Sequence, residues 1–226
     1  MKVRALLLDL DGTLVDTAPD MVGSLNRVLS NHKKPLVDVA LASKIVSNGG
    51  KALIEYGFGS DLTPSISAGL VKEFLEDYKQ HLANDSVVYD GMIECLEFCE
   101  SHKLKWGVIT NKPLHLAKDL LAGLGLLERC AILLGGDSLP VKKPDPVPML
   151  HTCMVLNLAP SECLYVGDHE RDMIASNAAG MDSAAALWGY IAESERPESW
   201  KANYLLKSPN GLLNLLKDKL VENRLK

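Results

Sequence analysis

A short apolar run that ends in two aspartates constrains the fold of this chain more than any other stretch of its sequence. Residues 3–8 are mostly apolar, which is typical of a strand buried on both faces of a parallel sheet. Asp9 and Asp11 follow directly, and Gly12 supplies a tight turn after them. Residues i and i+2 of an extended strand project to the same side, so both carboxylates can point to one site beyond the strand's carboxyl end, where open α/β sheets bind ligands. Two negative charges held this close predict a divalent cation at that site, a raised carboxyl pKa, or both.

Strand and helix patterns alternate through the second half of the chain. The predicted strands cover residues 104–110, 130–134, 163–166, 183–187 and 203–206, and the predicted helices cover residues 91–100, 114–121, 146–156, 171–179 and 212–225. Such alternation predicts right-handed crossovers between parallel strands. We therefore expect an α/β fold, a doubly wound parallel sheet with helices on both faces.

An all-helical block interrupts this alternation after the first strand. Helical patterns cover residues 17–35, 38–45, 51–56 and 64–82, and the turn Ser47-Asn48-Gly49-Gly50 lies between the second and the third. We interpret residues 17–83 as an inserted helical cap domain. Residues 1–16 and 84–226 would then form the core domain.

Composition and charge exclude several classes of protein. The chain has 226 residues, of which 47% are hydrophobic, enough for one α/β core and a smaller appendage. Its net charge is −5 and no cluster of lysine or arginine is present, so we expect no nucleic acid partner. The first apolar run stops at Asp9 without a cleavage site, and no apolar segment is long enough to span a bilayer. We expect a cytoplasmic protein with no membrane partner.

The five cysteines match neither a zinc site nor a disulfide framework, because their number is odd and their spacing irregular. Cys95 and Cys99 are one helical turn apart. We interpret the cysteines as reduced residues in or near a helix core.

Polar residues also follow two later segments that end at the same edge of the predicted sheet. Thr110 and Asn111 come at the end of the strand over residues 104–110, where the hydroxyl of Thr110 could donate to a phosphoryl oxygen. Lys143 precedes a segment with three alternating prolines, which hold the residues before them extended. A lysine fixed in this way can serve as a point charge for phosphate.

A further strand ends in an acid, and a second acid comes four residues later. Asp168 follows the apolar strand over residues 163–166 and is well placed to ligate a metal. Asp172 falls in the first turn of the next helix, where a carboxylate either ligates the metal or interacts with the helix dipole.

Together these segments resemble the motifs of the haloacid dehalogenase-like (HAD) phosphohydrolases in order and spacing. The stretch from Asp9 through Asp11 to Thr13 is similar to the first motif, Thr110 to the second, Lys143 to the third and residues 167–172 to the fourth. The resemblance covers essentially the whole chain. It implies a Rossmann-like core and a cap of the family's C1 type, formed by the helical block.

The resemblance implies a magnesium-dependent phosphatase mechanism. Asp9 would attack phosphorus to give an aspartyl-phosphate, and Asp11 would protonate the leaving group and then activate water. Thr110 and Lys143 would stabilise the charge on the phosphoryl group. The Mg²⁺ ligands would be Asp9, Asp11 through its backbone carbonyl, Asp168 and Asp172.

Two groups within the family are similar to this chain. Residues 11–19, 108–113, 135–137 and 142–146 resemble the phosphoglycolate phosphatases. Residues 105–113 and the aromatic residues Trp188, Tyr190 and Trp200 look like the N-acetylmuramic acid 6-phosphate phosphatases, whose larger substrate these aromatic residues would help to accommodate. The general pattern favours a phosphoglycolate phosphatase.

Both groups act on phosphomonoesters that bear a carboxylate. We expect substrate contacts from Asn111 and, in the cap, from Asn48, Gly49, Gly50 and Lys51, because a turn that opens a helix presents N–H groups to an anion. Alternatively, this turn only connects two helices of the cap.

Three other functions fit part of the pattern. A dehalogenase of the same fold has no use for Asp11 as an acid. A phosphosugar mutase would use both acids and a similar cap, so product analysis is needed to separate it from a phosphatase. A phospho-accepting signalling domain, from a different class, needs no helical insertion. We expect a monomer or a homodimer that acts on a small phosphorylated metabolite.

Overall fold

A parallel sheet forms the centre of the computed structural model, which describes residues 3–59 and 61–224. Within these residues the sheet has six strands in the order β5-β4-β1-β6-β7-β8, and every neighbouring pair is parallel. The strands are β1 (Ala5–Leu8), β4 (Lys105–Ile109), β5 (Leu133–Leu134), β6 (Cys163–Gly167), β7 (Asp182–Ala186) and β8 (Tyr204–Leu206). Strand β1 lies between β4 and β6, so the first predicted motif is at the middle of the sheet.

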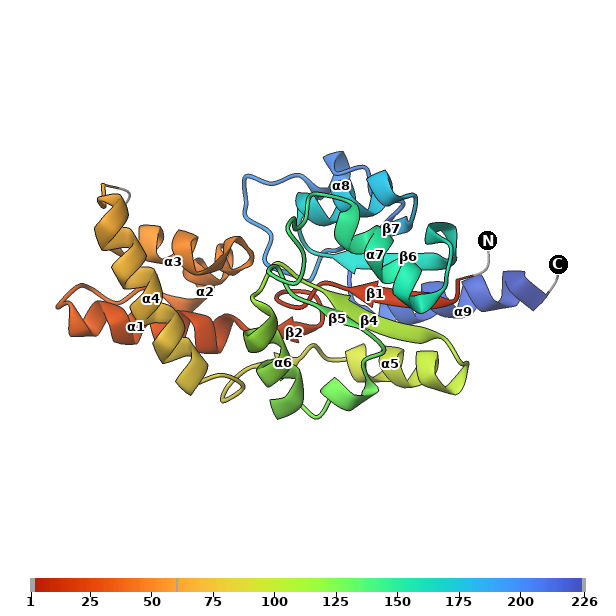
Figure 1. Ribbon diagram of the computed structural model, residues 1–226, viewed down its shortest axis with the longest axis horizontal. Helices are drawn as coiled ribbons and strands as arrows, with labels where there is room; N and C mark the ends of the chain where they lie inside the picture. Colours follow the sequence, from red (N-terminus) through yellow and green to blue (C-terminus); the bar gives the residue numbers. More distant parts are fainter. Residues whose placement is uncertain (1–2, 60, 225–226) are drawn as a thin grey trace.

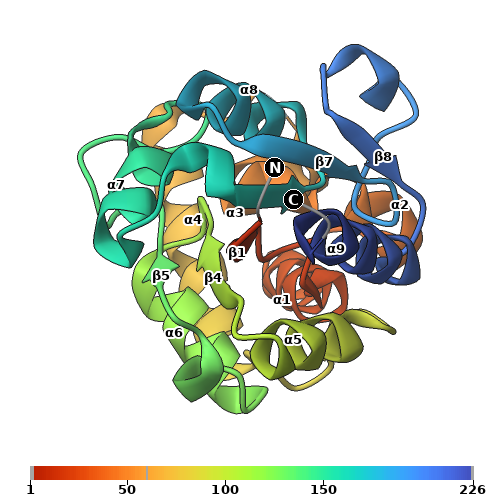
Figure 2. The ribbon, with the colours of Figure 1, turned by 90° about the vertical axis from the view of Figure 1, so that its right-hand side faces the viewer.

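Helices cover both faces of this sheet (Figure 2). One layer contains α5 (Met92–Ser101), α6 (Leu114–Gly123) and α9 (Pro209–Arg224), and the other contains α7 (Val147–Leu156) and α8 (Glu170–Ala179). Alternate residues of β1 serve the two layers: Leu6 and Leu8 pack with the first, and Ala5 and Leu7 with the second. The predicted α/β fold with a parallel sheet and two helical layers is confirmed.

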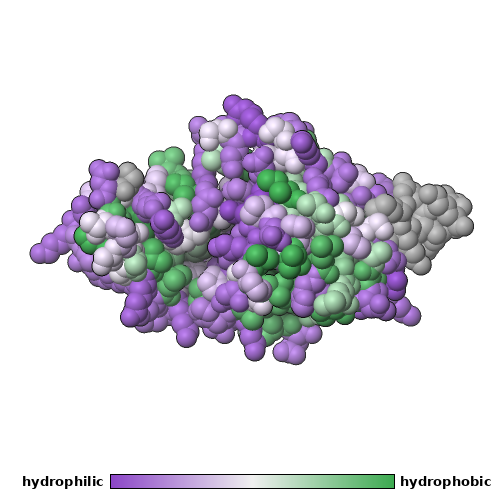
Figure 3. Space-filling model, turned by 45° about the horizontal axis from the view of Figure 1, so that its top comes forward, coloured by the Kyte–Doolittle hydropathy of each residue, from purple (hydrophilic) through white to green (hydrophobic). Residues whose placement is uncertain are grey.

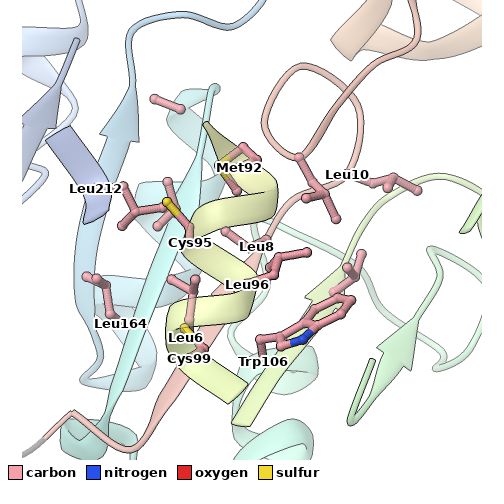
Figure 4. Close-up of a cluster of buried hydrophobic side chains, with 14 of the residues drawn as sticks. Leu6, Leu8, Leu10, Met92, Cys95, Leu96, Cys99, Trp106, Leu164 and Leu212 are labelled. Atoms are coloured by element: carbon pink, nitrogen blue, oxygen red, sulfur yellow. The ribbon is translucent and has the colours of Figure 1, made fainter. Parts of the chain in front are cut away.

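The core of the first layer shows how the apolar run of β1 is buried. Leu6 and Leu8 lie against Met92, Cys95 and Leu96 of α5 (Figure 4). Cys99, one turn further along α5, is also fully buried, and all five cysteines have free thiols. The cysteines therefore act as small apolar core residues or lie close to the core, as predicted.

The helices over residues 17–83, which we call the helical insertion, pack around a second hydrophobic cluster, to which Leu116 and Tyr190 of the rest of the chain also contribute. They are α1 (Ala18–Asn31), α2 (Val39–Ser43), a 3₁₀ helix (Val46–Asn48), α3 (Gly49–Phe58) and α4 (Pro64–Gln80). Leu25 and Leu29 of α1 belong to the same buried cluster as Phe74 and Tyr78 of α4. The insertion lies at one end of the molecule, beyond the carboxyl ends of the strands (Figure 1).

A short antiparallel ribbon joins the insertion to the rest of the chain. Strand β2 (Val15–Asp16) comes immediately before α1 and pairs with β3 (Val87–Val88), which follows α4. The two segments that connect the insertion to the rest of the chain therefore lie side by side. This ribbon was not predicted, because two residues are too few to show an alternating pattern.

Several predicted boundaries differ from the structure. Strand β5 contains only residues 133 and 134 of the five predicted, because a 3₁₀ helix (Leu127–Arg129) immediately precedes this segment. Helix α3 begins at Gly49, two residues earlier than predicted, and α9 begins at Pro209 instead of residue 212. The predicted end of the last helix, residue 225, lies outside the described residues. No helix in residues 3–59 and 61–224 is long and apolar enough to cross a membrane.

Candidate active site

The turn after β1 brings Asp9 close to the end of β6. Asp9 is buried, and its Oδ1 atom accepts a hydrogen bond of 2.8 Å from the backbone N–H of Leu10. Gly12 has a φ of +81°, and a Cβ atom at this position would overlap the carboxylate of Asp168. Only glycine fits both the left-handed backbone and this close approach. The turn therefore holds the two motifs against each other.

Three buried carboxylates meet at this point of the sheet edge. One carboxylate oxygen from each of Asp9, Asp168 and Asp172 lies within 4.8 Å of the other two. Lys143 lies among them, with its Nζ atom 2.9 Å from Asp9 Oδ1 and 2.7 Å from Asp172 Oδ1. The side chain of Lys143 is 1% exposed, so these charges interact with little screening by water.

The chemistry of this cluster fits a divalent cation. When all three carboxyl groups are ionised, they and the ammonium group of Lys143 leave two negative charges in a buried space, and carboxylate oxygens are the ligands that Mg²⁺ prefers. Burial, followed by the charges of Asp9 and Asp172, raises the pKa of Asp168 well above its usual range. A cation with two positive charges would remove this cost.

Lys143 and Asp172 are held by a tyrosine that the sequence analysis missed. The hydroxyl of Tyr165 accepts a hydrogen bond of 2.8 Å from Lys143 Nζ and donates to the carbonyl oxygen of Ile109 at 2.9 Å. Burial alone would lower the pKa of Lys143, but Asp172 and Asp9 raise it above its usual value. Lys143 is therefore a charged ammonium group in a fixed position. Tyr165 lies inside an apolar strand, where an aromatic residue is normally only part of the core.

Asp11 has a different set of partners from Asp9. Its Oδ1 atom accepts hydrogen bonds from the hydroxyl of Thr17 at 2.7 Å and from the Nζ atom of Lys112 at 2.8 Å. Lys112 Nζ also lies 2.9 Å from the hydroxyl of Tyr78 in α4. Lys112 was missed, although its position two residues after Thr110 at a strand end was a usable signal.

Most of the predicted site residues line one cavity of about 570 Å³. Asp9, Asp11, Thr110, Asn111 and Lys143 form its floor at the sheet edge. Its volume lies within the ~300–1,000 Å³ of small-molecule sites. Figure 3 shows hydrophilic residues gathered at the surface where the insertion meets the rest of the molecule. Asp168 and Asp172 do not line the cavity and are fully buried.

The predicted residues of the insertion form part of the cavity wall. Asn48, Gly49, Gly50 and Lys51 all line it. The side chain of Lys51 is 73% exposed, and its Nζ atom lies 3.6 Å from Glu55 Oε1. Its ammonium group is therefore already close to a carboxylate.

The same turn of the insertion contacts the fourth motif directly. The hydroxyl of Ser47 donates to Asp168 Oδ2 at 2.9 Å, and Arg171 donates to the backbone carbonyl of Ser47. Asn48 Oδ1 lies 3.2 Å from the Nε2 atom of His169. The turn over residues 47–50 therefore joins the insertion to the residues around the carboxylate cluster.

The three aromatic residues expected near a large substrate do not line the cavity. Tyr190 accepts hydrogen bonds from the backbone N–H groups of Thr17 and Ala18 and donates to Asp16 at 2.6 Å. Trp188 donates to the backbone carbonyl of Thr13, and Trp200 is buried against Met173 in a separate cluster. The expectation was wrong for all three, because Tyr190 bonds to the start of the insertion, Trp188 to the turn after β1, and Trp200 packs against α8 and β7.

The comparisons with known proteins agree with this geometry. The chain belongs to the haloacid dehalogenase-like hydrolase family, whose model matches residues 6–186. The resemblance found in the sequence motifs is therefore confirmed, and the protein is an enzyme of this hydrolase family.

Two curated relatives and one solved structure show how similar the chain is to particular members. It is 42% identical to a phosphoglycolate phosphatase of Xanthomonas campestris pv. campestris over 91% of this chain and 93% of the relative. It is 39% identical to an N-acetylmuramic acid 6-phosphate phosphatase of Pseudomonas putida over 92% of this chain and 94% of the relative. A crystal structure described as a predicted phosphoglycolate phosphatase from Haemophilus somnus superposes with a TM-score of 0.86 at 26% identity, covering 96% of this chain and 99% of that one.

Proposed function

We propose that this protein is a magnesium-dependent phosphatase that hydrolyses a small phosphomonoester through an aspartyl-phosphate. The observation that carries the proposal is that Asp9, Asp11, Thr110 and Lys143 line one cavity at the carboxyl end of the sheet. A nucleophile, a proton donor and positive charge for the phosphoryl group are the three requirements of this reaction.

In the first step, a carboxylate oxygen of Asp9 attacks phosphorus, and the bond from phosphorus to the leaving oxygen breaks. Asp11 gives its proton to that oxygen. In the second step, Asp11 takes a proton from water as the water attacks phosphorus, which releases phosphate and restores Asp9. The two carboxylates have different partners: Asp9 is held by the backbone N–H of Leu10 and by Lys143, and Asp11 by Thr17 and Lys112.

Two side chains are positioned to bind the phosphoryl oxygens. The hydroxyl of Thr110 accepts a hydrogen bond of 3.1 Å from the backbone N–H of Lys112, which leaves its own proton free to donate. Lys143 is charged and fixed by Asp9, Asp172 and Tyr165. Fixed donors of this kind stabilise charge that develops in the transition state.

The residues that would hold Mg²⁺ are Asp9, Asp168 and Asp172, together with the backbone carbonyl of Asp11. The bound ion would neutralise negative charge between the carboxylates and the phosphate. Lys143 would remain paired with Asp9 and Asp172 when the ion is bound, because each ion pair uses only one oxygen of the carboxylate.

The helical insertion, residues 17–83, serves as the cap in this proposal, and residues 1–16 and 84–226 as the core. The buried cluster that its helices share and the two-stranded ribbon at its base support movement as a unit. Closure over the cavity would exclude water while the aspartyl-phosphate forms.

The proposed substrate is phosphoglycolate or a close analogue, and the alternative is N-acetylmuramic acid 6-phosphate. Both molecules combine a phosphate with a carboxylate, and each appears in the name of a relative about 40% identical to this chain. Asn111 and the turn residues Asn48, Gly49, Gly50 and Lys51 are the proposed substrate contacts, since they line the cavity. The N-terminal N–H groups of α3, which begins at Gly49, are suited to an anion.

A turnover assay with Mg²⁺ tests the proposal. We expect release of phosphate from phosphoglycolate or N-acetylmuramic acid 6-phosphate, and the ratio of the two kcat/KM values assigns the substrate. A phosphosugar mutase would instead return an isomeric sugar phosphate, and a signalling domain would keep its phosphate on Asp9 without turnover. Either result would contradict the proposed reaction.

A further inference from the structure

Arg171 is a cation in the cavity wall that the proposed reaction does not use. It lies in the first turn of α8 and lines the cavity beside residues 47–51 of the insertion. Its guanidinium donates one hydrogen bond to the backbone carbonyl of Ser47. Its Nε atom is buried and has no hydrogen-bond partner among the described residues. A buried donor without a partner is rare, which points to a ligand as the missing acceptor.

The other buried cations of the cavity are already neutralised. Lys143 pairs with Asp9 and Asp172, and Lys112 pairs with Asp11. No ion pair within the described residues includes Arg171. Among the described residues that line this cavity, Arg171 is therefore a partly buried cation without a carboxylate partner.

We propose that Arg171 is a specificity-determining residue that binds the carboxylate of the substrate. The proposal rests on the phosphatase function above and names its substrate class, a phosphomonoester with a carboxylate on the alcohol side. A guanidinium is planar and presents parallel N–H groups that match the two oxygens of a carboxylate. The phosphate would bind beside Asp9, Thr110 and Lys143, and the carboxylate beside Arg171.

Arg171 is better suited to this role than Lys51, the cation expected from the sequence. Lys51 is mostly exposed and faces Glu55, so water and a carboxylate already compensate its charge. Arg171 has a donor that is shielded from water, so water screens its electrostatic attraction to a bound carboxylate less. The contact with Ser47 also places this cation where the insertion meets the fourth motif, so an occupied site would hold the insertion against the rest of the chain.

Pairs of substrates in which only one member has a carboxylate test the proposal. One pair is phosphoglycolate and 2-hydroxyethyl phosphate, and the other is N-acetylmuramic acid 6-phosphate and N-acetylglucosamine 6-phosphate. In the wild-type enzyme we expect the carboxylated member of at least one pair to have the higher kcat/KM. Arg171→Gln should lower kcat/KM for that member by about 10- to 100-fold, the loss expected for a charge-assisted hydrogen-bond pair, and change the neutral member by less than about threefold.

A matched control separates carboxylate binding from attachment of the insertion. Lys44 in the insertion pairs with Glu193 at 2.6 Å and does not line the cavity, so Lys44→Ala removes a contact between the insertion and the rest of the chain without touching the proposed site. We expect this variant to keep the wild-type preference for carboxylated substrates. Lys51→Ala should reduce that preference less than Arg171→Gln does.

The outcomes are distinguishable. If the wild-type enzyme hydrolyses phosphomonoesters without preferring the carboxylated members, the role of Arg171 is contradicted while the phosphatase function stands. An equal loss on both members of a pair in Arg171→Gln assigns Arg171 to the phosphoryl group and also contradicts the proposal. If no phosphomonoester is hydrolysed at all, the proposed function itself fails. If Arg171→Gln does not fold, the ratio of kcat/KM values for the two members of a pair is compared between the wild-type enzyme and Arg171→Lys instead.

Discussion

The Nζ atom of Lys112 lies 2.8 Å from Asp11 Oδ1, and this partly buried ion pair also contacts the helical insertion. The same ammonium group is 2.9 Å from the hydroxyl of Tyr78 in α4. Burial alone would lower the pKa of Lys112, but Asp11 and Tyr78 raise it above its usual value. Burial raises the pKa of Tyr78 to about 12, so at neutral pH a charged lysine meets a neutral phenol. The insertion is thereby connected to the proposed acid and base of the reaction.

We predict that Lys112→Met lowers kcat by at least about 100-fold, the scale of general acid–base catalysis, with a smaller change in KM. Lys112 is a positioning residue that holds the carboxylate of Asp11. Steady-state kinetics with an aryl phosphate measures the effect. Lys105→Met is the matched control, because Lys105 donates to the carbonyl of Leu156 away from the cavity. An unchanged kcat in Lys112→Met would show that Lys112 is not required to position Asp11.

Gly12→Ala should destabilise the protein and abolish turnover. An alanine Cβ would overlap the carboxylate of Asp168, and the φ of +81° disfavours any L side chain. We expect a loss of at least about 2 kcal/mol in the free energy of unfolding, measured by urea denaturation. Gly69→Ala in α4, where a Cβ atom meets open space, should instead be neutral or raise stability by about 0.5 kcal/mol. Equal stability of the two variants would contradict the close packing at Gly12.

Asp77→Asn should destabilise the insertion in a pH-dependent way. Asp77 in α4 pairs with Arg27 in α1 at 2.8 Å. Burial alone would raise the pKa of Asp77, but the hydrogen bonds from Arg27 and Ser24 and the charges of Arg27 and His81 together outweigh it and hold the pKa below its usual value. The pair therefore contributes stability above the unfolded pKa of Asp77, and this contribution is lost as the pH falls through the lower folded pKa.

The measurement is the Tm of both proteins between pH 7 and pH 3. At pH 7 we expect Asp77→Asn to lower the Tm by about 2–4 °C, the shift that ~1 kcal/mol gives in a chain of this size. The difference should shrink below about pH 4, where the wild-type carboxylate also loses its charge. Glu76→Gln, which affects a 3.8 Å pair with Lys72 on the exposed surface, should change the Tm less at every pH. A constant Tm difference from pH 7 to pH 3 would exclude a role for the charge of Asp77.

Removal of divalent cations should abolish turnover, and Mg²⁺ should restore it. Binding to the native state alone raises the Tm by mass action, so we also expect Mg²⁺ to stabilise the wild-type protein. Asp168→Asn should lose this stabilisation, because Asp168 belongs to the carboxylate cluster, whereas the exposed Asp119→Asn should keep it. Ca²⁺ should stabilise the fold without supporting the rate, because it takes more ligands at longer distances and would occupy both oxygens of Asp9. Full activity of the metal-stripped enzyme would contradict the assignment.

The sequence predicted the alternating strands and helices of the fold and the site residues that lie at the ends of strands. The apolar run of β1 and the alternation after residue 90 were sufficient for the parallel sheet, because both depend on local periodicity. Asp9, Thr110 and Lys143 could be predicted together because the carboxyl ends of parallel strands meet at one edge.

The missed features depend on contacts between distant segments. Arg171 carries no local signal that separates it from a solvated surface residue, and only the folded chain shows that it lines the cavity. Lys112 lies close to a strand end, but only the folded chain shows that its side chain is buried beside Asp11. The error at Tyr190 and Trp200 has the same origin. Aromatic residues were interpreted as substrate contacts, whereas the structure uses them to hold loops.

The rate of the Asp9→Asn variant tests the central claim most directly. Asparagine keeps the shape of the side chain, and Lys143 keeps its second partner Asp172, so we expect a folded protein with an unchanged circular dichroism spectrum. An amide is a poor nucleophile, and kcat with an aryl phosphate should fall by more than about 1,000-fold. Asp119→Asn, on the exposed surface of α6, should retain the wild-type rate. If Asp9→Asn keeps more than about a tenth of that rate, Asp9 is not the nucleophile, and the proposed aspartyl-phosphate mechanism is contradicted.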